Sequence, residues 1–370
     1  MASTFKDIKP NDRVSTRTLL HEAIPLTGTI VSGTYGEFGS EDNIKNFSHG
    51  MFQSVYDYPY LSSSANHIFD ITCGYSSDSN LYNTSNSLNS KKTNIYNQMA
   101  QVCVGYDITG SILRFDEDGD ILAGGRKVQE GYFLNFSRLL VKDEIKKGTV
   151  SLTVGVHESF TASYGSSVLI TDAGGVNDYR VNSPVGEYGI LYATGSGNNP
   201  VDNTVDQYNS TYDAVPVGLV FYQAGVMMLS SSLFQDKSDN GVLTNANKTC
   251  FMDSGGNTVQ QSLTGSTITV NANNIRHRLG NIQFNNAVEL NSTIYFCRAN
   301  HNEFNYSSNP TYLSSSQVRV KQVSSDEPIA YITSVGLYSE NNELLAVGKL
   351  SEPLKKTPAN EFTIRTRLDY

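Results

Sequence analysis

Three aspartates alternate with other residues in the segment Asp116-Glu117-Asp118-Gly119-Asp120. Alternating carboxylates of this kind open calcium-binding loops, in which side-chain oxygens at positions one, three and five bind the cation. Such a loop also needs glycine at position six and glutamate at position twelve, where this sequence has Ile121 and Lys127. We therefore expect a turn between two short strands, residues 111–115 and 121–122, and no metal site.

A second segment could supply a nucleophile at Ser254. The sequence Cys250-Phe251-Met252-Asp253-Ser254-Gly255-Gly256 resembles the nucleophile segment of chymotrypsin-like serine proteases. The resemblance implies an oxyanion hole made by glycine N–H groups, together with a histidine base. The family's glycine before the aspartate is Met252 here, and His67 lacks the family's Ala-Ala-His-Cys context. We expect a β-turn at Asp253 and keep a serine hydrolase that uses Ser254 as an alternative.

The sequence contains no other motif typical of metal or nucleotide binding. No pair of histidines has HxH or HExxH spacing, and there is neither a P-loop nor a GxGxxG sequence, so the sequence predicts no cofactor. Arg276-His277-Arg278 is the only compact basic cluster, and we expect it to pair with acidic residues of a neighbouring protein. The histidines are His21, His49, His67, His157, His277 and His301.

The charge balance argues against nucleic acid as a partner. The chain has 27 Lys and Arg against 36 Asp and Glu, a net charge of −9, which repels a phosphate backbone. The lysine pairs at 91–92, 146–147 and 355–356 are isolated, and each is predicted to lie in a solvated turn. The N-terminus has no apolar signal segment and no apolar run approaches 18 residues, which predicts synthesis in a cytoplasm and no membrane partner.

The four cysteines, Cys73, Cys103, Cys250 and Cys297, are far apart in the sequence and include no CxxC pair. A structural zinc site is therefore not expected. Two alternatives are open. The cysteines are buried reduced thiols, or they form one or two disulfides after leaving the cell.

The composition favours strands. Tyrosine and phenylalanine number 22 and 16, tryptophan is absent, and the charged fraction is only 17%. Aromatic residues on a Ser, Thr, Asn and Gly background suit half-buried strands joined by polar turns, and do not suit a helix bundle. We predict a mostly β protein with sandwich- or barrel-like sheets, long loops, a few short helices and an extended N-terminal arm.

The 370 residues allow more than one domain. We divide them into an N-terminal arm at 1–30, a β-rich domain with long polar loops at 31–265, and a C-terminal β module at 266–370. In the middle part, apolar periodicity predicts helices at 95–105 and 138–147, and strands at 150–156, 168–171 and 215–229. Polar stretches predict exposed loops at 76–94, 194–211 and 235–248.

The C-terminal module has the most regular pattern. Strands are predicted at 267–270, 292–297 and 318–321, followed by a hairpin at 331–350 with its turn at 340–342. The last segment, 362–370, alternates apolar and charged residues, with Phe362, Ile364, Leu368 and Tyr370 on one face. Such a strand pairs within its own domain or adds to the sheet of a neighbour.

The same hairpin carries a family resemblance. Its two arms read Tyr331-Ile332-Thr333-Ser334-Val335-Gly336-Leu337-Tyr338 and Glu343-Leu344-Leu345-Ala346-Val347-Gly348-Lys349, followed by Pro353. Over about forty residues this resembles the hairpin of tail-fibre collar and baseplate-attachment segments of phages. In fibres the hairpin lies near the N-terminus, and here it lies near the C-terminus, which favours a wedge, neck or adaptor subunit.

A broader likeness covers most of the chain. Residues 43–72, 179–192 and 302–313 resemble virion structural proteins of large contractile-tailed phages. The resemblance implies a non-enzymatic virion subunit of the tail, baseplate or neck, with no catalytic residues. Its partners would be copies of itself and other virion proteins. A receptor- or glycan-binding tail component that recognises a host-surface glycan is the alternative, because tyrosine-rich segments such as 302–312 can stack on sugars.

Overall fold

The computed structural model describes residues 5–26, 42–83, 87–121, 125–162, 165–194, 200–244, 250–306, 313–314, 317–318, 325 and 327–370. Among the described residues, strands account for 44% and helices for 16%, which confirms the prediction of a mostly β protein. The main sheet is antiparallel and open, and the described strands form no closed barrel. The chain divides into two compact units: unit 1 comprises residues 1–20 and 289–370, and unit 2 comprises residues 21–288.

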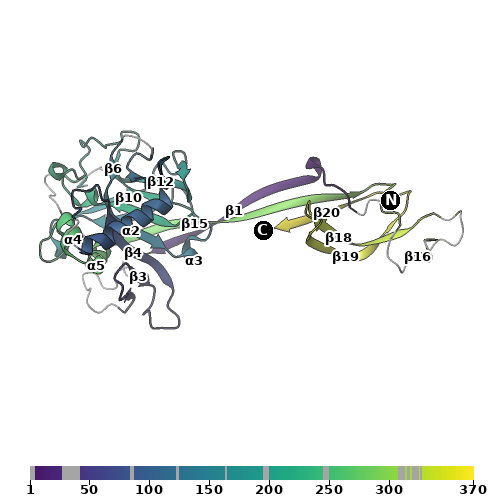
Figure 1. Ribbon diagram of the computed structural model, residues 1–370, viewed down its shortest axis with the longest axis horizontal. Helices are drawn as coiled ribbons and strands as arrows, with labels where there is room; N and C mark the ends of the chain where they lie inside the picture. The colour runs from purple at the N-terminus through teal and green to yellow at the C-terminus, as the bar shows by residue number, and fades with distance from the viewer. Residues whose placement is uncertain are drawn as a thin grey trace. The chain divides into compact units, whose positions relative to one another are not determined.

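Unit 2 contains most of the described strands and all four α-helices that the structure describes (Figure 1). In chain order its elements are β2 (Ile44–Asn46), β3 (Gln53–Tyr56), β4 (His67–Tyr75), α2 (Ser87–Cys103), β5 (Phe115–Asp116), β6 (Lys127–Val128), β7 (Glu130–Phe136), α3 (Arg138–Val141), β8 (Glu144–Ile145), β9 (Ser151–Gly155), η2 (Phe160–Ala162), β10 (Ser167–Thr171), β11 (Arg180–Ser183), β12 (Gly186–Thr194), β13 (Ala214–Phe221), β14 (Val226–Ser230), η3 (Ser231–Phe234), η4 (Lys237–Asp239), α4 (Val259–Gly265) and α5 (Ile268–Arg278). 

Two long strands, β1 (Arg13–Leu26) and β15 (Leu279–Ala299), each have one part in unit 1 and the other part in unit 2. Residues 13–20 of β1 and 289–299 of β15 belong to unit 1, and the rest of each strand belongs to unit 2. The other unit 1 elements are η1 (Pro10–Asp12), β16 (Leu313–Ser314), β17 (Gln317–Val318), β18 (Ala330–Tyr338), β19 (Leu344–Lys356) and β20 (Phe362–Asp369).

The sheet of unit 2 runs β15-β9-β10-β12-β13-β14-β7-β4-β3-β2, with β8 also on β15 and β11 on β12. Its central strands are apolar because both faces are covered, and every residue of β13 and β14 is buried. Pro216 lies within β13, where it cannot donate a ladder hydrogen bond. A register shift in the partner strand β12, between Leu191 and Tyr192, lies at this position.

Helix α2 packs directly on strand β4. A Cβ atom at Gly74 would lie 2.5 Å from the carbonyl oxygen of Lys92, so this glycine allows the helix backbone to approach the sheet. The helix includes residues 95–103 of the one predicted at 95–105, but it begins at Ser87 and ends at Cys103, so the second half of the loop predicted at 76–94 is wrong. The reason is tertiary: Lys92 is fully buried, and its ammonium group donates to the carbonyls of Leu263 and Ser266 near the end of α4.

Two other sequence predictions in this region are wrong. Residues 267–270 begin helix α5 and are not a strand, because the Thr267 side chain accepts a hydrogen bond from the Val270 N–H and caps the helix. The helix predicted at 138–147 ends at Val141. Lys142 adopts a left-handed conformation with a φ of 56°, and β8 then pairs with β15.

The hydrophobic core lies wholly between Ile44 and Phe284, within unit 2. Unit 2 ends at Val288, and the boundary expected at 265/266 lies between α4 and α5. Most of the expected 1–30 arm that the structure describes is strand β1, next to β15 in the sheet. The strand predicted at 150–156 is confirmed over residues 151–155 as β9, and those predicted at 168–171 and 292–297 are confirmed as parts of β10 and β15.

The C-terminal predictions are also confirmed in unit 1. The hairpin is β18 and β19, with Asn342 at a φ of 64° in its turn. The last strand, β20, alternates half-buried and exposed residues and pairs with β15 of its own chain, from Ser292↔Asp369 to Ala299↔Phe362. Of the strand predicted at 318–321, residues 319–321 lie outside the described residues.

Candidate functional site

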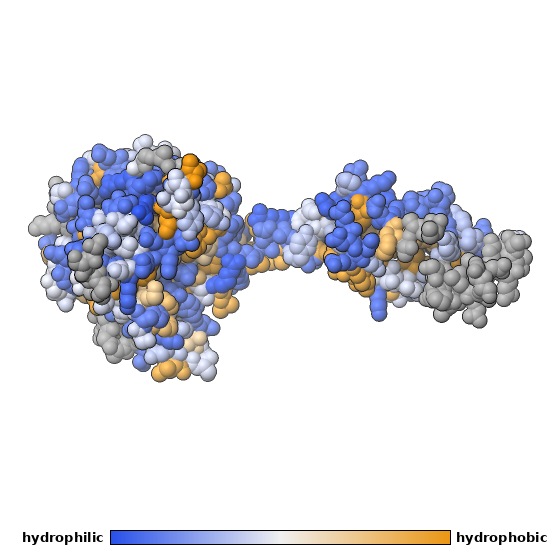
Figure 2. All heavy atoms as spheres, in the orientation of Figure 1, coloured by the Kyte–Doolittle hydropathy of each residue, from blue (hydrophilic) through white to orange (hydrophobic). Residues whose placement is uncertain are grey.

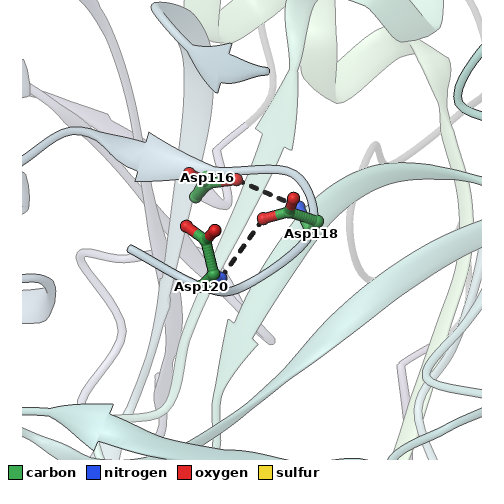
Figure 3. Close-up of side chains that lie close together, drawn as sticks. All are labelled: Asp116, Asp118 and Asp120. Atoms are coloured by element: carbon green, nitrogen blue, oxygen red, sulfur yellow. Dashed lines mark hydrogen bonds between the residues drawn. The ribbon is translucent and has the colours of Figure 1, made fainter. Parts of the chain in front are cut away.

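The three alternating aspartates converge at one turn of unit 2. Asp116 ends β5, and the carboxylates of Asp116, Asp118 and Asp120 offer oxygen atoms within 4.8 Å of one another (Figure 3). Asp116 accepts from the Asp118 N–H at 3.2 Å, and Asp118 accepts from the Asp120 N–H at 3.2 Å. These bonds are the Asx turns by which aspartate stabilises a tight loop.

Lys127 is the cation of this cluster. It stands opposite Asp116 in the β5–β6 pair, forms an ion pair with Asp116, and lies 3.8 Å from the Asp120 carboxylate. It occupies position twelve, where a calcium loop would have a glutamate ligand. The expected turn between strands is present, but its second strand is β6. Ile121 does not continue a strand, because its φ is 62°, and Leu122 lies outside the described residues.

Glu117, in the same turn, is a buried carboxyl group. One of its carboxylate oxygens lies 3.7 Å from the Arg126 guanidinium. Burial raises the pKa of Glu117 to about 7, and Arg126 lowers it only in part. This carboxyl therefore changes its protonation state near neutral pH.

Asp172 is a buried carboxylate that belongs to no motif in the sequence. It accepts from the Gly148 N–H at 2.7 Å, from the Val150 N–H at 2.9 Å and from the Tyr222 hydroxyl at 3.1 Å. Burial raises the pKa of Asp172 to about 6 in spite of these bonds. All three donors belong to unit 2, and the arrangement fixes the start of β9 against the end of β10. Its role is structural.

The basic cluster at 276–278 is buried in α5, so the prediction that it pairs with a neighbour is wrong. The Arg278 guanidinium donates to the carbonyls of Gly155 at 3.0 Å and His157 at 3.3 Å. Arg276 lies 3.3 Å from the Gln53 side-chain oxygen, and the His277 ring lies 3.0 Å from the Phe160 carbonyl. Burial also lowers the pKa of His277 to about 4. The cluster therefore stabilises the fold of unit 2.

The predicted solvated turns at the lysine pairs are also wrong at two places. Lys92 is buried in helix α2, as described above. Lys356 is buried at the end of β19 and donates to the Asn305 side chain at 2.7 Å and to the Thr357 carbonyl at 2.8 Å. In the third pair, Lys147 forms an ion pair with Glu187 at 2.5 Å. The second lysine of each pair therefore has a structural partner.

The segment around Ser254 forms the expected turn. Asp253 accepts from the Gly255 N–H at 2.9 Å and from the Asn257 side chain at 2.7 Å, so its carboxylate stabilises the turn. Ser254 itself is exposed, and in the described part of the chain no histidine forms a hydrogen bond with it. His67 instead lies 2.8 Å from Asp70. The structure does not bring Ser254 and His67 into a catalytic arrangement.

All four cysteines are free thiols. Cys73, Cys103 and Cys250 are buried, and burial raises the pKa of each to about 12. Cys250 donates to the Val156 carbonyl at 2.7 Å. Cys297 in β15 is half-buried. The structure therefore has the reduced alternative, and the disulfides are not formed in it.

Unit 1 differs from unit 2 because it has scarcely any core. Among its described residues only six side chains are buried, and Leu337 is the only one of them that is apolar and larger than alanine. The other five are Ser292, Thr293, Ala299, Ala330 and Lys356. A unit of 102 residues that folds alone normally buries many large apolar side chains.

Its apolar side chains lie on the surface instead. Of the 27 exposed large hydrophobic residues in the described chain, 14 belong to unit 1. They are Phe5, Ile8, Val14, Leu19, Leu20, Leu290, Phe304, Tyr306, Tyr331, Tyr338, Leu344, Leu345, Val347 and Tyr370. Figure 2 shows apolar surface among the hydrophilic residues of both units. Where such residues form a contiguous patch, the patch can mark an interaction site.

The hairpin of unit 1 also stands apart as a sheet. Strands β18 and β19 pair only with each other, so in the described structure both outer edges of this ribbon are open. An isolated two-stranded ribbon is marginally stable in water unless another surface packs on it. The ribbon therefore depends on contacts with other parts of unit 1, such as Phe5 on Tyr338 and Asn305 on Lys356.

None of the described helices is both long and apolar enough to cross a bilayer. Comparison with protein-family models, with curated proteins and with solved structures gives no match.

Proposed function

We propose that the chain is a structural subunit of a tailed-phage virion, in the tail, baseplate or neck, and that it acts by assembling with other virion proteins. One observation carries this proposal: unit 1 has strands with exposed apolar side chains and almost no core of its own. Such a unit becomes stable when partners cover it, as in obligate complexes.

The resemblance in the sequence supports the same function. The residues that resemble phage attachment segments, 331–338 and 343–349, form β18 and the start of β19, which is the ribbon with open edges. The segment with the resemblance is thus the one whose edges are open to a partner. The chain would be made in the host cytoplasm and located in the virion.

Quantitative mass spectrometry of purified particles tests this function. The proposal predicts that the chain co-purifies with the particles in a fixed ratio to known tail proteins. A copy number near about six or twelve would agree with a ring of symmetric subunits. Absence of the chain from washed particles would contradict the proposal.

A receptor- or glycan-binding component is the second candidate. The connection between β3 and β4 exposes Tyr58, Tyr60 and Leu61, with exposed fractions of 61%, 37% and 86%. Exposed aromatic rings can stack on sugar rings. Binding of host-surface oligosaccharides to the purified chain, lost in a Tyr58→Ala variant and retained in Tyr106→Ala, would support this function. A chain that binds none of them would exclude it. A hydrolase is tested by Ser254→Ala, which would abolish hydrolysis only if Ser254 is the nucleophile.

A further inference from the structure

Four of the exposed apolar side chains of unit 1 lie together at the turn end of the hairpin. Tyr338 of β18 stands opposite Leu344 of β19, and Gly336 stands opposite Val347, so these residues share one face of the ribbon. A Cβ atom at Gly336 would lie 2.9 Å from the Tyr338 ring and 3.3 Å from Leu344, which shows that both side chains lean over this glycine. The Phe5 ring contacts Tyr338 edge-on, with ring centroids 4.8 Å apart.

We call Phe5, Tyr338, Leu344 and Val347 the hairpin patch. Their exposed fractions are 48%, 46%, 53% and 56%, so about half of each side chain remains in water after the unit has folded. Together they expose roughly 350 Å² of apolar surface. One face of a standard interface contains about 450 Å² of apolar surface, and Leu345, which is 68% exposed, lies next to the patch. The patch has the size of an interface centre.

The distribution of charge indicates which partner covers the patch. Unit 1 has 12 Lys and Arg against 11 Asp and Glu, a net charge of +1, whereas unit 2 has 15 against 25, a net charge of −10. Two copies of unit 2 therefore repel each other, and two copies of unit 1 do not. Many charges of unit 1 are already paired within it, among them Arg17–Glu289 at 2.5 Å and Arg298–Asp12 at 2.7 Å.

The charges beside the patch are arranged for self-pairing. Glu340 and Glu343 lie in the turn at one end, and Lys349 lies at the other end, opposite Ser334 on the patch face. In a two-fold contact whose axis runs across the ribbon, each end of the patch meets the opposite end on the other copy. Acidic residues of one copy then lie near the lysine of the other, which favours a contact between identical surfaces.

We infer that the hairpin patch is covered by the hairpin patch of a second copy of this chain in a two-fold contact. This inference rests on the proposed function and names its first partner. Copies of the chain are present together wherever the chain is made. The hairpin patch of unit 1 is therefore covered by a second copy before unit 1 meets any other virion protein. The contact would make the dimer the building block of the assembly.

Sedimentation velocity of the purified full-length chain tests the inference. We expect a dimer at micromolar concentrations. Val347→Asp places a charge at the centre of the contact in both copies, and it should raise the dissociation constant at least about 100-fold. Val181→Asp is the matched control, because Val181 is a strand valine of unit 2 with 70% exposure and should leave the dimer unchanged.

A charge exchange separates a lost contact from a misfolded hairpin. Glu343→Lys and Lys349→Glu should each weaken the dimer about fivefold, and the double variant should restore it. A monomeric wild type, three or more copies, or no restoration in the double variant would overturn the inference. A monomeric chain that is nevertheless present in purified particles would leave the proposed function standing, with a different virion protein on the patch.

Discussion

Removal of the Asp172 carboxylate should strongly destabilise unit 2. The carboxylate accepts three hydrogen bonds, from the N–H groups of Gly148 and Val150 and from the Tyr222 hydroxyl, at 2.7 to 3.1 Å. Only 1% of Asp172 is exposed, so water cannot replace the lost acceptor without a rearrangement of the chain. Asp172→Ala leaves all three donors unsatisfied.

The magnitude follows from those three donors. Each buried donor without a partner costs about 1–3 kcal/mol, which gives a loss of about 4 kcal/mol for Asp172→Ala. Asp172→Asn keeps one acceptor oxygen and should cost about 2 kcal/mol at pH 7. Burial raises the pKa of Asp172 to about 6 from 3.8, so the wild type should show a partial loss of unfolding free energy as the pH rises from about 4 through 6 and the buried carboxyl ionises, while its hydrogen bonds remain. The asparagine variant should lack that loss.

Urea unfolding followed by tyrosine fluorescence and circular dichroism measures these differences, because the chain has 22 tyrosines and no tryptophan. Asp206→Asn is the control, since Asp206 is an exposed aspartate in the same unit. If Asp172→Ala lies within 1 kcal/mol of the wild type, the three hydrogen bonds do not stabilise the fold as we argue.

Three further predictions concern buried groups of unit 2. Burial raises the pKa of Glu117 to about 7, so the wild type loses stability as this carboxyl ionises in the folded state. The unfolding free energy of Glu117→Gln should therefore rise by about 3 kcal/mol relative to that of the wild type from pH 4.5 to 8. Parallel pH profiles of the two proteins would contradict this. Lys92→Met keeps the buried stem but leaves the Leu263 and Ser266 carbonyls without their donor, so it should lower the unfolding free energy by about 2–3 kcal/mol, whereas exposed Lys91→Met should not. A thiol reagent should modify at most Cys297 in the native chain and all four cysteines in urea; rapid modification of more than one native thiol would show that the other three are accessible.

Local patterns were sufficient for most of the strands. Alternation along 150–156 and 362–370 places one face of each segment against neighbouring residues, and β9 and β20 show that alternation. The hairpin at 331–350 was predictable because two apolar segments flank the polar turn at 340–342. These elements depend on residues close together in the sequence.

Helix α5 shows where local patterns mislead. Its first residues, Ile268, Thr269 and Val270, have strand propensity, yet the cap at Thr267 and the burial of Ile268, Ala272 and Ile275 select a helix. Ile268, Ala272 and Ile275 are spaced by four and three residues, which is a helical pattern. This pattern decides the structure over the strand propensity of the three β-branched residues. The capping pair Thr258 and Gln261 similarly begins α4, a helix that our sequence analysis did not predict.

The buried polar residues could not be found from the sequence. The donors to Asp172 come from residues 148, 150 and 222, and the acceptors of Lys92 come from residues 263 and 266. Only the folded sheet brings such distant residues together. Of the chemical motifs, the alternating aspartates do meet at one turn, but the spacing alone did not reveal that Lys127 would pair with Asp116.

The central claim is that the chain assembles through unit 1, and cross-linking mass spectrometry of purified particles tests it most directly. Unit 1 offers the exposed lysines Lys349 and Lys355, and unit 2 offers Lys91 and Lys237. Links from Lys349 and Lys355 to other copies or to other virion proteins should dominate the links between chains. Links between chains that come mainly from Lys91 and Lys237, with unit 1 linked only within its own chain, would contradict the claim.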